Sequence, residues 1–199
     1  MKYTSFVRCA RVAAGAVLVA LLSACAHPIS VTPAKTPERI EAQLIPKKVA
    51  YAMTDAERGK EVVTPGGGGD KVSYYPYRDL EKAIRDALRA AYQDVVVVRS
   101  AKDATAVRES GAVLVFTPEI KTTSSSPSPF TWPPTRFSSE IICIVTDAGG
   151  QEVTRVSATG NGAAEFDEFK SNFSLASQRA GTDVATQLRD AIRSNDKLR

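Results

Sequence analysis

The fold of this chain is decided by residues 76–98, which read PYRDLEKAIRDALRAAYQDVVVV. The apolar residues of this stretch recur at the spacing of one helical face, with charged residues between them, and so predict an amphipathic helix: Leu80, Ala83, Ile84, Ala87, Leu88, Ala91 and Tyr92. Asp79 in the first turn suits the positive end of the helix dipole. The valines 95–98 are β-branched and predict a buried strand directly after the helix.

Alternation of apolar and polar residues extends the pattern on both sides of this stretch. Upstream, strands are predicted at 45–53, 61–64 and 71–75, the last two flanking Pro65 and four glycines, 66–69. Downstream, a short helix at 103–110 and strands at 112–121, 137–145 and 151–164 precede a second long helix at 174–194. The strands of the second half have connections too short for parallel crossovers. The order therefore predicts an α+β fold: a mainly antiparallel sheet with two helices packed on one face, a two-layer sandwich.

The amino terminus carries an export signal. Lys2, Arg8 and Arg11 precede an apolar run from Val12 to Leu22, which is typical of a secretory signal peptide. The run is too short for a spanning helix, which needs about 20 apolar residues. Leu22-Ser23-Ala24-Cys25 resembles the lipobox of bacterial lipoproteins. That resemblance implies removal of residues 1–24, attachment of diacylglycerol to Cys25 and acylation of its freed amine.

The residues after Cys25 bear on localisation. Ala26 follows the cysteine, in place of the Asp that would resemble an inner-membrane retention signal, so we expect a lipid-anchored protein on the periplasmic face of the outer membrane. Pro28, Pro33 and Pro37 lie within residues 25–44, which we expect to form a lipidated, flexible tether. Residues 45–199 then suit a single periplasmic domain.

Charge and cysteine content exclude several classes of protein. Loss of the three basic residues of the signal lowers the formal charge from +4 to +1, so no argument for nucleic acid binding remains. Cys9 leaves with the signal and Cys25 is modified, which leaves Cys143 without an intramolecular disulfide partner. Cys143 lies among isoleucines and valine, where a small buried side chain is expected.

No catalytic, metal or cofactor site is predicted. The single histidine, His27, is two residues after the anchor, where we expect no fixed position against a nucleophile or a metal. Residues 66–73, GGGGDKVS, lack the Gly-Lys-Ser/Thr order of a phosphate loop, so no nucleotide is expected. Glu165, Asp167 and Glu168 could serve as acid and base in glycan hydrolysis. Solvated charges near a helix start explain them equally.

The Pro-rich connection, residues 124–134, reads SSSPSPFTWPP and is the least ordinary segment of the chain. Its prolines favour a stiff, extended backbone that forms few ladder hydrogen bonds. Phe130 and Trp132 on such a loop could dock a partner at low entropic cost. They could equally fold back as a lid over the sheet edge, so both interpretations stay open.

Tyr77-Arg78-Asp79-Leu80, the helix, the valine strand, Ala112-Val113-Leu114-Val115, the hairpin and the terminal helix together resemble the YajG-type small lipoproteins. The outline is also similar to the ABC-transporter auxiliary lipoproteins and the lipopolysaccharide-assembly lipoprotein. The likeness covers about residues 45–195 and implies an envelope accessory role without catalytic residues. We therefore expect a non-enzymatic module with an envelope protein as its partner; the alternative is an envelope glycan hydrolase that uses Glu165 and Asp167.

Overall fold

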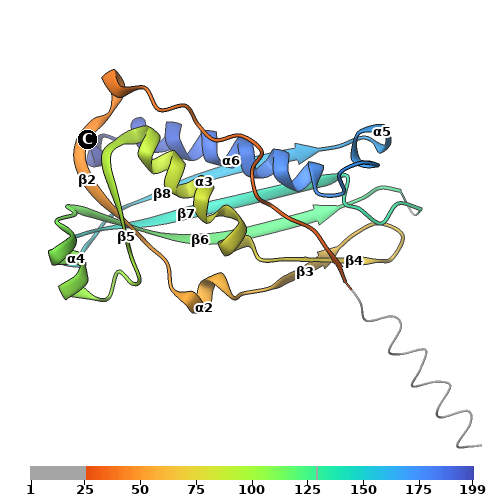
Figure 1. Ribbon diagram of the computed structural model, residues 1–199, viewed down its shortest axis with the longest axis horizontal. Coiled ribbons are helices and arrows are strands. Elements are labelled where there is room, and N and C mark those ends of the chain that lie inside the picture. Colours follow the sequence, from red (N-terminus) through yellow and green to blue (C-terminus); the bar gives the residue numbers. More distant parts are fainter. Residues whose placement is uncertain (1–25, 129) are drawn as a thin grey trace, which may run out of the picture.

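The computed structural model describes residues 26–128 and 130–199 (Figure 1). Cys25 and the expected signal peptide lie outside the described residues. In chain order the elements are β1 (His27–Pro28), η1 (Glu41–Gln43), β2 (Ile45–Ala52), α2 (Asp55–Arg58), β3 (Val62–Pro65), β4 (Lys71–Tyr74), α3 (Pro76–Ala91), β5 (Tyr92–Val98), α4 (Ala104–Ser110), β6 (Leu114–Ser125), β7 (Arg136–Asp147), β8 (Glu152–Ala163), α5 (Phe166–Phe169), α6 (Leu175–Arg193) and η2 (Asp196–Leu198).

The main sheet has five strands in the order β5-β2-β6-β7-β8. Strands β6, β7 and β8 are each 12 residues long and pair antiparallel, as predicted for the second half of the chain. Strand β2 is parallel to both of its neighbours, so the complete sheet is mixed. The valine strand β5 lies at the edge of the sheet and leaves Val97 exposed, which corrects the prediction of a fully buried strand.

Helices α3 and α6 cover one face of this sheet, and the main core lies between the two layers (Figure 1). The apolar stripe predicted for α3 is buried there, including Leu80, Ile84 and Leu88. This arrangement confirms the α+β two-layer class. The opposite face is covered in part by α4, whose Val107 packs with Ala50 and Val115 in a smaller cluster.

Helix α6 lies unusually close to β8. A Cβ atom on Gly160 would stand 2.2 Å from the backbone nitrogen of Val184, and one on Gly162 would stand 2.0 Å from the carbonyl oxygen of Ala176. Such separations exclude any side chain, so the two glycines permit direct contact between helix and strand backbones. The small residues Ala176 and Ala180 on the facing side of α6 complete this contact.

A second, smaller sheet has the order β1-β4-β3. Strands β3 and β4 form the predicted hairpin around the glycines, with Val62 opposite Tyr74. Strand β1 comes from the segment expected to be a tether and pairs parallel with β4. Hydroxyl groups join this sheet to β6, since Tyr74 Oη lies 2.6 Å from Thr122 Oγ1 and Ser124 Oγ donates to the Pro65 carbonyl at 2.7 Å.

The segment after β1 crosses the helical layer, so the expectation of a flexible tether over residues 26–44 is corrected (Figure 1). Val31 is completely buried, and its backbone N–H donates to the Asp79 carboxylate at 3.1 Å. The Ser177 hydroxyl donates to the Ser30 carbonyl at 2.7 Å. Gly181 of α6 allows this crossing, because a Cβ there would stand 2.5 Å from the Val31 carbonyl oxygen. Burial of Val31 against α3 and α6 holds the segment in place.

Candidate functional site

The Pro-rich connection between β6 and β7 lies at one end of the molecule, beside the glycine turn between β3 and β4 (right-hand side of Figure 1). The Gly67 backbone N–H donates to the Trp132 carbonyl at 2.9 Å. A Cβ on Gly66 would stand 2.3 Å from that oxygen, and one on Gly67 would stand 1.6 Å from the Thr131 carbonyl oxygen. These two glycines therefore serve a close backbone approach, which explains a glycine run that has no phosphate-loop spacing.

Trp132 is the centre of an aromatic stack. Its ring lies 4.2 Å from the His27 ring with an interplanar angle of 29°, and 4.8 Å from the Phe173 ring in a tilted arrangement. Trp132 is half-buried and packs against the main core. The indole therefore joins the amino-terminal strand, the Pro-rich connection and the approach to α6.

Phe130 behaves differently from Trp132, although both belong to the same connection. Its side chain is 95% exposed. The two residues predicted as one docking pair are thus divided: Trp132 covers the end of the core, as the lid interpretation requires, and Phe130 stands in solvent, as docking requires. Phe173 and Phe166 are exposed large side chains as well, at 47% and 65%. We call Phe130, Trp132, Phe166 and Phe173 the aromatic end.

His27 occupies a fixed position in the structure, contrary to the expectation of a mobile residue. Its Nε2 atom lies 3.7 Å from Asp70 Oδ2, in addition to the stacking contact with Trp132. Within residues 26–128 and 130–199, no group of three His, Cys, Asp or Glu side chains could hold a metal ion. The contacts of His27 are those of a residue that attaches β1 to the rest of the fold.

The carboxylates considered for hydrolysis surround the start of α5. Glu165 is the N-cap of this short helix, and its backbone N–H donates to Glu168 Oε2 at 3.0 Å. Arg179 of α6 donates to Glu168 Oε1 at 2.6 Å, and this bond lowers the pKa of Glu168 from 4.5 to about 2. A glycosidase general acid needs a raised pKa. Asp167 is exposed and pairs with Lys170 at 3.2 Å. These contacts support the interpretation as surface charges at a helix start.

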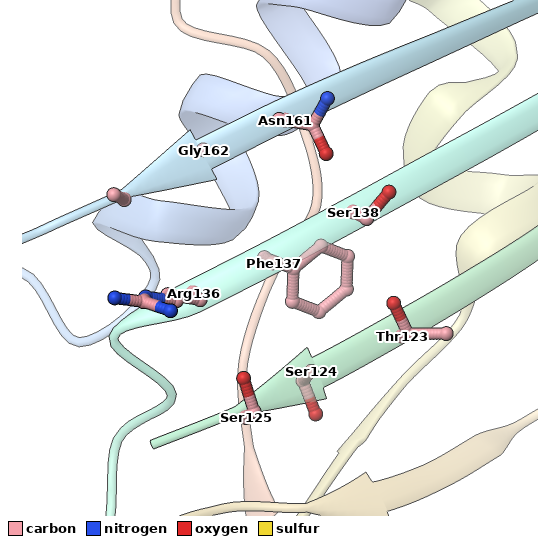
Figure 2. A pocket seen from close by; sticks show the side chains of 9 residues that line it. Thr123, Ser124, Ser125, Arg136, Phe137, Ser138, Asn161 and Gly162 are labelled. Carbon is pink, nitrogen blue, oxygen red and sulfur yellow. The ribbon is translucent and has the colours of Figure 1, made fainter. Parts of the chain in front are cut away.

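A shallow polar hollow of about 470 Å³ lies at the carboxyl end of β6 and the adjacent ends of β7 and β8 (Figure 2). Figure 2 shows its lining on these three neighbouring strands. The polar groups there are the hydroxyls of Thr123, Ser125 and Ser138, the Asn161 amide and the Arg136 guanidinium. These groups can donate and accept hydrogen bonds, but the lining contains neither a carboxylate nor a histidine to transfer a proton.

Cys143 is buried in β7, as predicted. Burial raises the pKa of its thiol to about 12, so the reactive thiolate is scarce at neutral pH. Among residues 26–128 and 130–199, no helix combines the length and the apolar character needed to cross a membrane.

Comparison with known proteins supports the fold and goes no further. No family model matches this chain, and no curated protein matches it. Among solved structures, protein XCC0632 from Xanthomonas campestris, of family DUF330, aligns with a TM-score of 0.50 and 11% identity over 84% of this chain and 92% of that one. The PelC dodecamer from Paraburkholderia phytofirmans, solved in space groups C2 and P6, aligns with a TM-score of 0.42 and 16% identity over 78% and 94%. At these identities the likeness to XCC0632 concerns the fold alone.

Two contributors to the aromatic end were missed in the sequence. Phe173 lies just before α6 and carries no pattern that links it to Trp132. The docking of the amino-terminal segment left a weak trace, because Ile29 and Val31 alternate with polar residues as in a short strand. Three prolines in the same region hid that alternation.

Proposed function

We propose that this protein is a non-catalytic accessory lipoprotein of the outer membrane, anchored through Cys25, whose contact surface is the aromatic end. The lipobox-like residues 22–25 and Ala26 after them support the anchor and its location. The resemblance to YajG-type lipoproteins belongs to this proposal as well.

One observation carries the proposal: the exposed aromatic end is attached directly to the residues that follow the anchor. His27 stacks on Trp132 at 4.2 Å, and Phe130 nearby is 95% exposed. Large exposed apolar side chains that gather in one place mark interaction surfaces. The hydrogen bonds of Gly67 and Ser124 hold the connection in place before any partner arrives, so little conformational entropy is lost on contact.

The hydrolase alternative receives no support from the aromatic end. Glu168 is held ionised by Arg179, and Asp167 pairs with a neighbouring lysine on the surface. Replacing both Glu165 and Asp167 by their amides, Glu165→Gln and Asp167→Asn, should therefore leave the cellular role of the protein unchanged. Loss of that role with normal folding would restore the hydrolase alternative.

The anchor is tested by metabolic labelling with an acyl-chain probe. Wild-type protein should incorporate the probe and fractionate with the outer membrane, and Cys25→Ser should do neither, because the thioether cannot form. A Cys25→Ser variant that still labels and fractionates like the wild type would contradict the anchor.

The contact surface is tested by a photo-crosslinking amino acid placed at Phe130 in intact envelopes. Val113, which is 49% exposed just after α4, is the matched control site. We expect crosslinks from position 130 in excess of those from position 113. Equal yields from the two sites would remove the evidence that the aromatic end contacts anything.

A further inference from the structure

From the geometry of the aromatic end we infer that it contacts the lipid interface of the same membrane that holds the anchor, with Phe130 inserted among the lipids. This inference rests on the proposed function, because it requires acyl chains on Cys25. It names the occupant of the contact surface: a bilayer and not a protein.

The first step is the short distance between anchor and domain. His27 is two residues from Cys25, and two residues of chain span at most about 7 Å. His27 itself is fixed, through the parallel pairing of β1 with β4 and the stacking contact with Trp132. No flexible tether therefore separates the domain from the membrane. The end of the molecule that contains β1 must lie against the headgroups.

The second step is the side chains that this end presents. Phe130, Phe166 and Phe173 are 95%, 65% and 47% exposed, although each has enough apolar surface to gain by leaving water. Trp132 is half-buried between His27 and Phe173. Aromatic side chains concentrate at membrane–water interfaces, where an apolar ring and a polar edge are both accommodated. The composition of the aromatic end is that of an interfacial surface.

The third step is the charge around these rings. Near them, acidic and basic groups pair with each other: His27 with Asp70 at 3.7 Å, Asp167 with Lys170 at 3.2 Å, and Glu168 with Arg179 at 2.6 Å. Paired charges of both signs give no strong attraction to anionic lipids. The contact is therefore expected to depend on aromatic insertion and to need the anchor, which keeps the weakly binding surface at a high local concentration.

Trp132 is the single tryptophan of the chain and reports on this contact without any label. The lipidated full-length protein is reconstituted into phosphatidylcholine vesicles whose acyl chains carry bromine either near the headgroups or near the chain ends. We expect Trp132 emission to shift to shorter wavelength relative to detergent, to lose accessibility to iodide, and to be quenched more strongly by bromines near the headgroups. Emission that is unquenched at both depths would overturn the inference.

Two variants separate insertion from general proximity. Phe130→Ser should reduce the quenching of Trp132 by lipid bromines while the melting temperature stays that of the wild type, because the Phe130 ring contacts solvent. Val113→Ser, the control near α4, should quench like the wild type. Equal quenching of Phe130→Ser and wild type would show that Phe130 does not insert and would overturn the inference.

Mass spectrometry of the same samples distinguishes this failure from failure of the proposed function. Protein without acyl chains on Cys25 would contradict the anchor itself. Acylated protein with unquenched Trp132, together with a protein crosslinked at position 130 in intact envelopes, would assign the aromatic end to a protein partner. That combination keeps the accessory role and overturns the membrane contact.

Discussion

Glycine brings backbones together in two regions of this molecule, and the two regions treat their large side chains in opposite ways. Between α6 and β8, Gly160 and Gly162 let a helix lie directly on a strand, and the residues around them are buried. At the aromatic end, Gly66 and Gly67 let the Pro-rich connection lie on a turn, yet Phe130 stays 95% exposed.

The difference separates stability from contact. Burial at the interface of α6 and β8 lowers the free energy of the folded state, so changes there should act on unfolding. Exposure of rings at the aromatic end gains nothing for the isolated domain, so changes there should act on what the domain touches. The predictions below test this division, from the largest expected effect on stability to the smallest.

The largest effect is expected for Gly160→Ala. Its Cβ would stand 2.2 Å from the Val184 nitrogen, and because backbone cannot move aside like a flexible side chain, α6 must separate from β8. We expect a loss of about 3 kcal/mol or more in the free energy of unfolding. Gly59→Ala is the matched control, since the nearest atom would be 3.5 Å from its Cβ, and should change stability by no more than about 0.5 kcal/mol. Urea unfolding measures both, and equal losses would contradict the close approach.

The second effect concerns the helix that the sequence predicted most clearly. Leu88 is fully buried, and Leu88→Ala should cost about 2–5 kcal/mol through lost apolar contact and the cavity left behind. Arg89→Ala, next to it on the outer side of α3, should change stability by no more than about 0.5 kcal/mol. Similar melting shifts for the two variants would mean that the buried face of α3 is drawn wrongly.

The third effect tests the amino-terminal segment. Val31 is fully buried between the helices, so Val31→Ala removes two methyl groups from the core and should cost about 1.5 kcal/mol. Thr36→Ala, at an exposed position of the same segment, is the control and should have no measurable effect. If Val31→Ala is also silent, the segment is a tether after all, and the short distance between anchor and domain no longer holds.

The fourth effect divides Trp132 from Phe130. Trp132→Ala removes the ring that packs on His27, Phe173 and the core, and should cost about 1–2 kcal/mol, since aromatic contacts contribute about 0.5–1.5 kcal/mol beyond burial. Phe130→Ala should leave the melting temperature unchanged. A destabilised Phe130→Ala would show that its ring is part of the fold and would erase the contrast between the two regions.

The smallest effect is a pH dependence at the surface. Because Arg179 lowers the pKa of Glu168 from 4.5 to about 2, this pair stabilises the folded state above pH 4.5, and the contribution is lost as the pH falls toward 2. Urea midpoints of Glu168→Gln and wild type should therefore differ slightly at pH 7 and converge near pH 2. A difference that grows on acidification would reverse the sign and contradict the ion pair.

Local patterns in the sequence determined a large part of this protein. The spacing of apolar residues predicted α3 and α6, and turn residues predicted the hairpins, because helical and strand periodicity depend on neighbours a few residues apart. Asp103 and Gly111 marked the ends of α4, where the structure finds a capping side chain and a left-handed φ of 69°. The lipobox-like residues are likewise a linear signal and need no fold.

Only the tertiary structure decided how distant segments meet. Parallel pairing of β2 with β5 and β6, the edge position of the valines, and the docking of residues 27–31 all depend on which surfaces remain uncovered once α3 and α6 are placed. The stack of His27, Trp132 and Phe173 joins three segments far apart in the sequence, and no local pattern encodes it. Burial is a property of the assembled layers, so the sequence could propose Phe130 and Trp132 as a pair, and only their packing could separate the ring that covers the core from the ring that faces outward.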